Sequence, residues 1–151
     1  MTARILLDTN ILIYAHDRAV FSKQAKALEV LDGVQETGIG LLTTQVLAEF
    51  FWVATRRLSP PLPVGDAASQ VDRLSRAFPV QPVTSFVVLE ALKGVRDHGM
   101  PYWDAQIWAS ARMNQIPVVF SEDFSHGSLV EGVRFLNPFV EDFRLAECLR
   151  D

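Results

Sequence analysis

Short apolar runs alternate along the chain with longer stretches in which apolar residues recur at helical spacing. The short runs predict β-strands at residues 5–8, 39–43, 80–83, 116–120 and 133–136. The longer stretches predict helices at residues 11–15, 22–31, 44–57, 64–78, 85–98, 101–114 and 141–149. Strands separated by helices pair in parallel through crossover connections. We therefore expect an α/β fold, a three-layer α/β/α sandwich around a central, mostly parallel sheet.

Two aspartates follow predicted strands. Asp8 ends the first apolar run, and Asp123 comes shortly after the run that ends at residue 120. In an open parallel sheet, the carboxyl ends of the strands form the edge where the functional crevice lies. Aspartate is also a favoured helix cap, so capping is an alternative explanation for each of these residues.

Two further acids lie in apolar helical stretches. Glu49 is the only polar residue within residues 46–54. A carboxylate buried without a partner costs several kcal/mol or takes up a proton, although a glutamate reaching out to solvent is the ordinary alternative. Asp104 opens a helix, where the helix dipole favours an acid by about 0.3–1 kcal/mol. That explanation covers Asp104 alone and leaves the other three acids unexplained.

The four acids predict a metal site if they converge. Like charges raise one another's pKa, so such a cluster cannot stay ionised without a cation. Oxygen ligands without histidine or thiolate suit Mg²⁺ or Mn²⁺, whereas the lone Cys148 and three scattered histidines do not form a zinc-binding pattern. A carboxylate-held divalent ion suits phosphodiester hydrolysis, because it activates water and offsets charge on the phosphate.

Taken together, these motifs resemble the PIN-domain ribonucleases, and among them the VapC-type toxins of bacterial toxin–antitoxin pairs. The matching segments are Asp8-Thr9-Asn10, Glu49, Tyr102-Trp103-Asp104-Ala105 and Ser121-Glu122-Asp123-Phe124. The resemblance covers nearly the whole chain in length and order of elements. It implies a Mg²⁺- or Mn²⁺-dependent endoribonuclease that is commonly a homodimer and is inhibited by a cognate antitoxin.

The resemblance also implies roles for individual residues. The family's acidic metal-site positions are matched by Asp8, Glu49, Asp104 and Asp123. Asp8 and Asp104 are expected to bind the ion directly, and Glu49 to bind it directly or through water and to orient the nucleophile. Asp123 is the fourth acid, at which family members vary, and Glu122 beside it is an alternative. Three polar neighbours are expected to hold the carboxylates and waters in place: Thr9, Asn10 and Ser121.

Length, composition and charge restrict the possible classes of protein. The 151 residues, 49% of them apolar, predict a single PIN-like domain over residues 1–151, and the net charge of −4 excludes a generically basic nucleic-acid coat protein. No apolar run approaches the ~18 residues of a membrane helix, and Asp8 interrupts the pattern of a signal peptide, so we expect a cytoplasmic protein. A mean hydropathy above zero favours a buried partner surface, as in a dimer.

RNA would have to be held by local features rather than by net charge. Candidate phosphate contacts are Arg56, Arg57, Arg73, Arg76, Lys93 and Arg96, with a solvated helix face as the alternative for each. Trp103 is a candidate for base stacking, whereas Trp108 is expected in the core. His16 and His98 are expected to be ordinary structural or surface residues.

Three other protein classes are alternatives to the ribonuclease. A haloacid-dehalogenase-like phosphatase would carry a second aspartate two residues after the first, where this chain has Asn10. A receiver-type signalling domain would need adjacent acids before its phosphorylated aspartate and a lysine further on. A non-catalytic PIN-like module that binds RNA or protein would have no need for four acids, because clustered carboxylates are costly without a metal.

Overall fold

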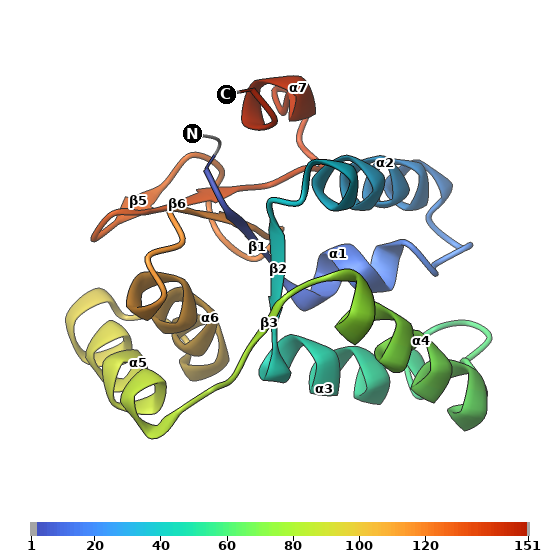
Figure 1. The fold of residues 1–151 in the computed structure, drawn as a ribbon, viewed down its shortest axis with the longest axis horizontal. Coiled ribbons are helices and arrows are strands. Elements are labelled where there is room, and N and C mark those ends of the chain that lie inside the picture. The colour runs from blue at the N-terminus through green and yellow to red at the C-terminus, as the bar shows by residue number, and fades with distance from the viewer. Residues whose placement is uncertain (1–2, 151) are drawn as a thin grey trace.

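A six-stranded sheet forms the centre of the structure, a computed structural model that describes residues 3–150 (Figure 1). The strands are β1 (Ile5–Leu7), β2 (Gly40–Thr43), β3 (Val80–Gln81), β4 (Val118–Phe120), β5 (Leu129–Val130) and β6 (Val133–Leu136). Their order across the sheet is β3-β2-β1-β4-β6-β5. All neighbouring strands are parallel except β5 and β6, which pair antiparallel. The predicted, mostly parallel sheet is confirmed.

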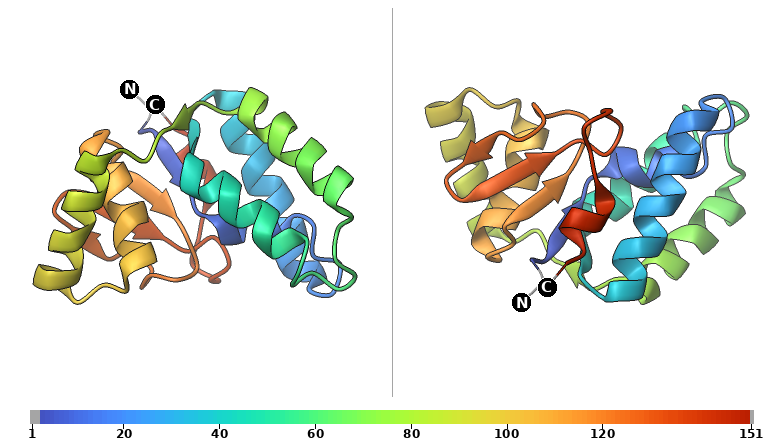
Figure 2. Two further views of the ribbon diagram at one scale, coloured as in Figure 1. Left: turned by 90° about the horizontal axis from the view of Figure 1, so that it is seen from below. Right: turned by 90° about the horizontal axis from the view of Figure 1, so that it is seen from above.

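Helices flank this sheet. They are α1 (Thr9–Tyr14), α2 (Phe21–Thr37), α3 (Thr44–Ala54), α4 (Val64–Ala77), α5 (Ser85–His98), α6 (Tyr102–Met113) and α7 (Leu145–Cys148). Figure 2 shows the α5–α6 pair at one end of the molecule and α2, α3 and α4 at the other, with strands between them. Accordingly, α6 contacts β4 and β6, whereas α2 and α3 contact β2. Within residues 3–150, none of the helices combines the length and the apolar character needed to cross a membrane.

The core explains why these elements pack as they do. β1 is buried along its whole length, since it lies between β2 and β4 with helices on both sides. Trp108 is fully buried, as predicted, and its indole N–H donates to the carbonyl of Val130 at 3.1 Å, which ties α6 to β5. A Cβ added at Gly94 would lie 2.9 Å from two ring atoms of Trp108. This glycine therefore allows α5 and α6 to approach closely.

Several predicted boundaries are wrong. The second helix continues through Gly33 to Thr37 and is capped by Gly38, which adopts a left-handed conformation with φ 72°. The predicted terminal helix is reduced to α7, because the preceding segment folds into turns that bury Phe143 against Phe120, with ring centres 5.3 Å apart. The β5 strand was not predicted, since two residues carry no recognisable alternation. Residues 1, 2 and 151 lie outside the described residues, and a single domain over 1–151 stays a prediction.

Candidate active site

Asp8 lies at the carboxyl end of β1 and caps α1. Its Oδ1 accepts a hydrogen bond from the backbone N–H of Thr9 and its Oδ2 accepts one from the hydroxyl of Ser121, both at 2.7 Å. The side chain is only 4% exposed. Burial raises the pKa of Asp8 from 3.8 to about 7 against the opposing effect of these hydrogen bonds, and the charges of Asp123 and Glu49 raise it further. Capping is therefore confirmed for Asp8, and it coexists with an unusually basic carboxylate.

Glu49 reaches the same edge of the sheet from α3. Its Oε2 accepts a hydrogen bond from the hydroxyl of Thr9 at 3.0 Å, and its Oε1 accepts one from the amide of Gln45 at 2.7 Å. The alternative of a freely solvated surface glutamate is wrong, because both carboxylate oxygens have protein donors. Thr9 binds Asp8 through its backbone and Glu49 through its side chain, so one residue joins the two acids.

A chain of buried amides extends from Glu49 into α6. Gln45 accepts a hydrogen bond from the amide of Gln106 at 2.9 Å, and Gln106 accepts one from the hydroxyl of Tyr102 at 2.8 Å. Gln45 also donates to the carbonyl of Trp103 at 3.2 Å. The sequence reasoning gave no role to Gln45 and Gln106, although a glutamine on an apolar helix must find partners when buried and Gln45 lies four residues before Glu49. The chain of amides fixes α3 against α6, which carries Asp104 in its first turn.

Asp104 and Asp123 complete the acidic group. Asp104 lies in the first turn of α6, where burial raises its pKa and the charges of Asp123 and Glu49 raise it further. Asp123 follows β4, and its Oδ2 accepts a hydrogen bond from the amide of Asn10 at 3.3 Å. Burial also raises the pKa of Asp123. No helix begins at Asp123 in the described part of the chain, so capping does not explain it.

Glu122, the alternative fourth acid, is engaged elsewhere. Its carboxylate accepts a hydrogen bond from the hydroxyl of Tyr14 at 2.7 Å and pairs with Lys23 at 2.8 Å. The charge of Asp123, in contrast, raises the pKa of Asp8. The structure therefore brings Asp123 into electrostatic contact with the other acids, and it adds Tyr14 and Lys23 as neighbours that the sequence reasoning missed.

Two polar side chains connect the loop after β4 to the end of β1. Ser121, which donates to Asp8, accepts hydrogen bonds from the backbone N–H of Asp123 at 3.0 Å and from the amide of Asn10 at 3.3 Å. Asn10 therefore contacts both Ser121 and Asp123. Together with Thr9, these two residues form hydrogen bonds to three of the four predicted acids.

Among the described residues, the acidic group lacks a paired cation. Within residues 3–150, no lysine or arginine forms an ion pair with the four acids Asp8, Glu49, Asp104 and Asp123. In the same part of the chain, no group of three or more His, Cys, Asp or Glu side chains is placed so that it could hold a metal ion as the structure stands. The acids are thus close enough to shift one another's pKa but are not in mutual contact. An uncompensated set of oxygen donors fits a hard divalent cation.

The comparison with protein families shows which family the chain belongs to. The family model of the PIN domain matches residues 5–127. The chain belongs to the PIN domain family. The matched residues run from β1 to the loop after β4 and include all four acids, and the phosphatase alternative is therefore wrong.

Solved structures share this PIN fold. A toxin–antitoxin complex from Klebsiella pneumoniae is 17% identical over 89% of this chain and 98% of its own, with a TM-score of 0.66. Mycobacterium tuberculosis VapC20, a toxin that cleaves the sarcin–ricin loop, is 24% identical over 86% and 98%, with a TM-score of 0.64. DNA-bound VapBC from Salmonella typhimurium is 17% identical over 90% and 98%, also with a TM-score of 0.64. None of the curated proteins compared with the chain matches it in sequence.

In this PIN domain, an open groove of about 630 Å³ lies beside Glu49. It is lined by Thr44, Gln45, Ala48, Glu49, Trp52, Val83, Trp103 and Gln106. Trp52 is 46% exposed and Trp103 is 63% exposed. The guanidinium carbons of Arg56 and Arg57 lie 4.8 and 5.1 Å from the centre of the Trp52 ring, at cation–π distance. We call this feature the tryptophan groove.

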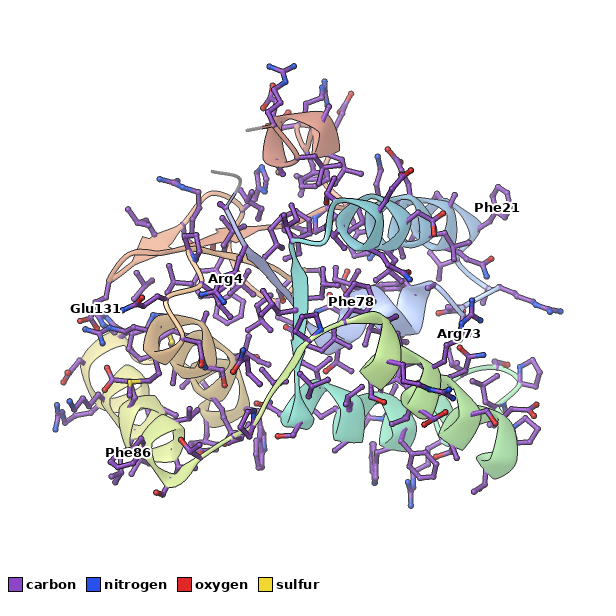
Figure 3. The ribbon with its side chains drawn as sticks, in the orientation of Figure 1. Arg4, Phe21, Arg73, Phe78, Phe86 and Glu131 are labelled. Atoms are coloured by element: carbon purple, nitrogen blue, oxygen red, sulfur yellow. The ribbon has the colours of Figure 1, made fainter. Side chains whose placement is uncertain are left out.

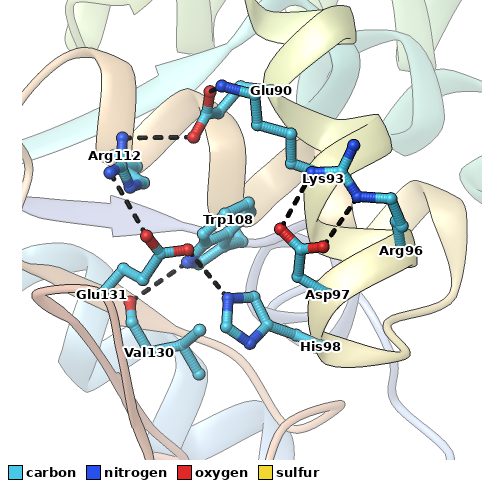
Figure 4. A network of polar contacts seen from close by, with 9 residues as sticks. All are labelled: Glu90, Lys93, Arg96, Asp97, His98, Trp108, Arg112, Val130 and Glu131. Carbon is cyan, nitrogen blue, oxygen red and sulfur yellow. Dashed lines mark hydrogen bonds and ion pairs between the residues drawn. The ribbon is translucent and has the colours of Figure 1, made fainter.

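Other predicted contacts lie on ordinary helix surfaces. Three candidate cations form ion pairs there: Arg76 with Asp72, Lys93 with Glu90 and Arg96 with Asp97. Lys93 and Arg96 belong to the polar network on α5 that Figure 4 shows. Arg73 lies exposed on α4 (Figure 3). Arg76, Lys93 and Arg96 therefore lie paired on solvated helix faces, and their phosphate contacts stay a prediction.

The two candidate histidines have structural neighbours, as expected. His16 packs against Phe50 with ring centres 5.4 Å apart, and burial lowers its pKa, with a further lowering by the charge of Arg73. Nε2 of His98 lies 2.8 Å from Glu131 and its ring meets the edge of Trp108 (Figure 4).

Proposed function

We propose that this PIN domain is an endoribonuclease that depends on Mg²⁺ or Mn²⁺. The observation that carries the proposal is the gathering of four carboxylates at the carboxyl edge of a parallel sheet, with no lysine or arginine paired to them in residues 3–150. RNA as the substrate class is supported by the similarity to VapC20, a toxin that cleaves the sarcin–ricin loop.

In this proposal, Asp8 and Asp104 hold the ion directly, and Asp123 lies beside them as a third acid. When bound, such an ion activates water for attack on phosphorus and offsets negative charge on the phosphate. Glu49, with both oxygens held by neutral donors, orients the attacking water. Thr9, Asn10 and Ser121 hold the carboxylates in place through the hydrogen bonds described above.

We also propose that the enzyme is the toxin of a toxin–antitoxin pair. Support comes from its similarity to the Klebsiella and Salmonella complexes. A toxin that acts on cellular RNA works in the cytoplasm. A homodimer is supported by large apolar side chains exposed on α5, among them Phe86, Leu89 and Leu92. Purification with the product of an adjacent small reading frame tests the antitoxin, and mass measurement by light scattering tests the dimer.

The test of catalysis uses a pool of cellular RNA with the unaltered protein, Asp8→Asn, Asp104→Asn and the control Asp97→Asn. Asp97 is an exposed aspartate paired with Arg96 on α5. We expect cleavage by the unaltered protein and the control, its loss with EDTA, and a decrease of more than about 100-fold in the other two variants. Cleavage at the original rate by both Asp8→Asn and Asp104→Asn would contradict the proposal. If the unaltered protein with Mn²⁺ leaves RNA intact, the non-catalytic alternative is favoured.

A further inference from the structure

Two tryptophans expose their indoles to one groove beside the acidic group. Trp52 comes from α3 and Trp103 from α6, and both line the tryptophan groove together with Glu49. Trp108, the third tryptophan of the chain, is fully buried in the core. Large apolar side chains that are exposed together on a concave surface mark a binding site more often than scattered ones do.

The lining of the groove favours a flat ligand that stacks. Ala48 and Val83 add apolar surface to the two indoles. The amides of Gln45 and Gln106 also line the groove, but they are hydrogen-bonded to each other and to Glu49 or Tyr102. The groove therefore offers aromatic faces in preference to free hydrogen-bonding groups. Base-stacking surfaces of this kind tolerate different sequences, because every base has a π-face.

The charges at the groove favour a nucleotide over a protein segment. Arg56 and Arg57 both lie against Trp52, and neither forms an ion pair with a residue in the described part of the chain. They remain available to contact phosphates next to a base stacked on Trp52. A purely apolar protein segment would offer neither arginine a negatively charged partner.

We infer that the tryptophan groove binds an unpaired nucleobase of the RNA, next to the phosphate that the acidic group acts on. The base stacks on Trp52 and Trp103, and Arg56 and Arg57 contact the flanking phosphates. This inference rests on the proposed endoribonuclease function. It implies a single-stranded substrate at the cleavage site, since the faces of a base inside a duplex are covered by its neighbours.

The test measures binding, so that it does not depend on cleavage. The probes are fluorescein-labelled hexaadenylate and a hexamer of the same length and charge whose sugars carry no bases, titrated in EDTA and followed by anisotropy. Repulsion by the carboxylates cancels in the ratio of the two affinities, because the charges are equal. We expect the unaltered protein to bind hexaadenylate roughly 5- to 150-fold more tightly than the abasic hexamer.

The variants assign this preference to the groove. Trp52→Ala and Trp103→Ala are each expected to reduce it at least about threefold, and Trp103→Phe to retain most of it. Phe21→Ala, which removes an exposed aromatic side chain at the start of α2 (Figure 3), outside the lining of the groove, is expected to leave it unchanged. Melting curves by circular dichroism confirm that the variants are folded.

Equal binding of the two probes by the unaltered protein would overturn the inference and would favour a protein segment as the ligand of the groove. An unchanged preference in both tryptophan-to-alanine variants would overturn it as well. The RNA-pool assay distinguishes the two proposals: cleavage without a base-dependent preference rejects the groove alone, whereas a preference without cleavage rejects the endoribonuclease.

Discussion

Replacing Asp8 by asparagine is expected to stabilise the metal-free protein while abolishing its activity. The pKa of Asp8 is raised from 3.8 to about 7, so the folded protein holds this proton more tightly than the unfolded chain does. Its contribution to stability is therefore fully present below pH 3.8 and is lost as the pH rises towards 7. A shift of this size corresponds to about 4 kcal/mol.

Asparagine removes the ionisation and keeps much of the geometry. Asn is as good a helix cap as Asp, and its amide oxygen can accept from the N–H of Thr9. The hydroxyl of Ser121, which already accepts two hydrogen bonds, loses its acceptor at residue 8, so the gain stays below the full value of the pKa shift. At pH 8 in EDTA, Asp8→Asn should therefore be more stable by up to about 4 kcal/mol. That corresponds to an increase on the order of 10 °C in the melting temperature of a chain this long.

Thermal unfolding followed by circular dichroism, at pH 8 and at pH 4, measures this effect. The advantage of Asp8→Asn should be large at pH 8 and should shrink at pH 4, where the unaltered protein carries a protonated Asp8. The exposed control Asp97→Asn should show no such gain, since the neighbouring Arg96 holds the pKa of Asp97 below its usual range. The reasoning would be refuted if Asp8→Asn were less stable than the unaltered protein at pH 8. It would also be refuted if the gain in melting temperature were the same at pH 8 and at pH 4.

Three further predictions concern the surroundings of the site. Gln45→Ala removes a hydrogen bond to Glu49 and the links to Trp103 and Gln106, and should lower kcat/KM on the order of tenfold, as steady-state cleavage assays would detect. Gly94→Ala should destabilise the protein by about 1–3 kcal/mol in urea unfolding, because the added methyl group meets Trp108, whereas Gly65→Ala adds a methyl group in open space and should not. Mn²⁺ should raise the melting temperature of the unaltered protein at pH 8, in proportion to the logarithm of its concentration above the Kd, and EDTA should reverse the increase.

The acidic site could be predicted largely from the sequence because its signals are local. A carboxylate directly after a buried apolar run, as at Asp8, lies at the functional edge of any parallel sheet. Glu49 was conspicuous because its neighbours in the helix are apolar. The structure supports both inferences, since Thr9 joins these two residues through hydrogen bonds.

The parts that could not be predicted depend on contacts between distant segments. Gln106 lies on a different helix from Gln45, and nothing local to either residue identifies the other as its partner. Trp52 lies in an apolar helical stretch, a pattern that predicts burial in the core. Only the packing of α3 beside α6 leaves its ring exposed in a groove. Asp123 was expected as the fourth acid with Glu122 as the alternative, and nothing in the sequence shows that Lys23 pairs with Glu122.

Titration with Mn²⁺ in an isothermal calorimeter tests most directly whether the clustered acids form a metal site. The unaltered protein and Asp97→Asn should bind Mn²⁺ with the same affinity, and Asp8→Asn and Asp104→Asn should each bind it more than about tenfold more weakly. Undiminished binding in both Asp8→Asn and Asp104→Asn, or no binding by the unaltered protein, would contradict the account.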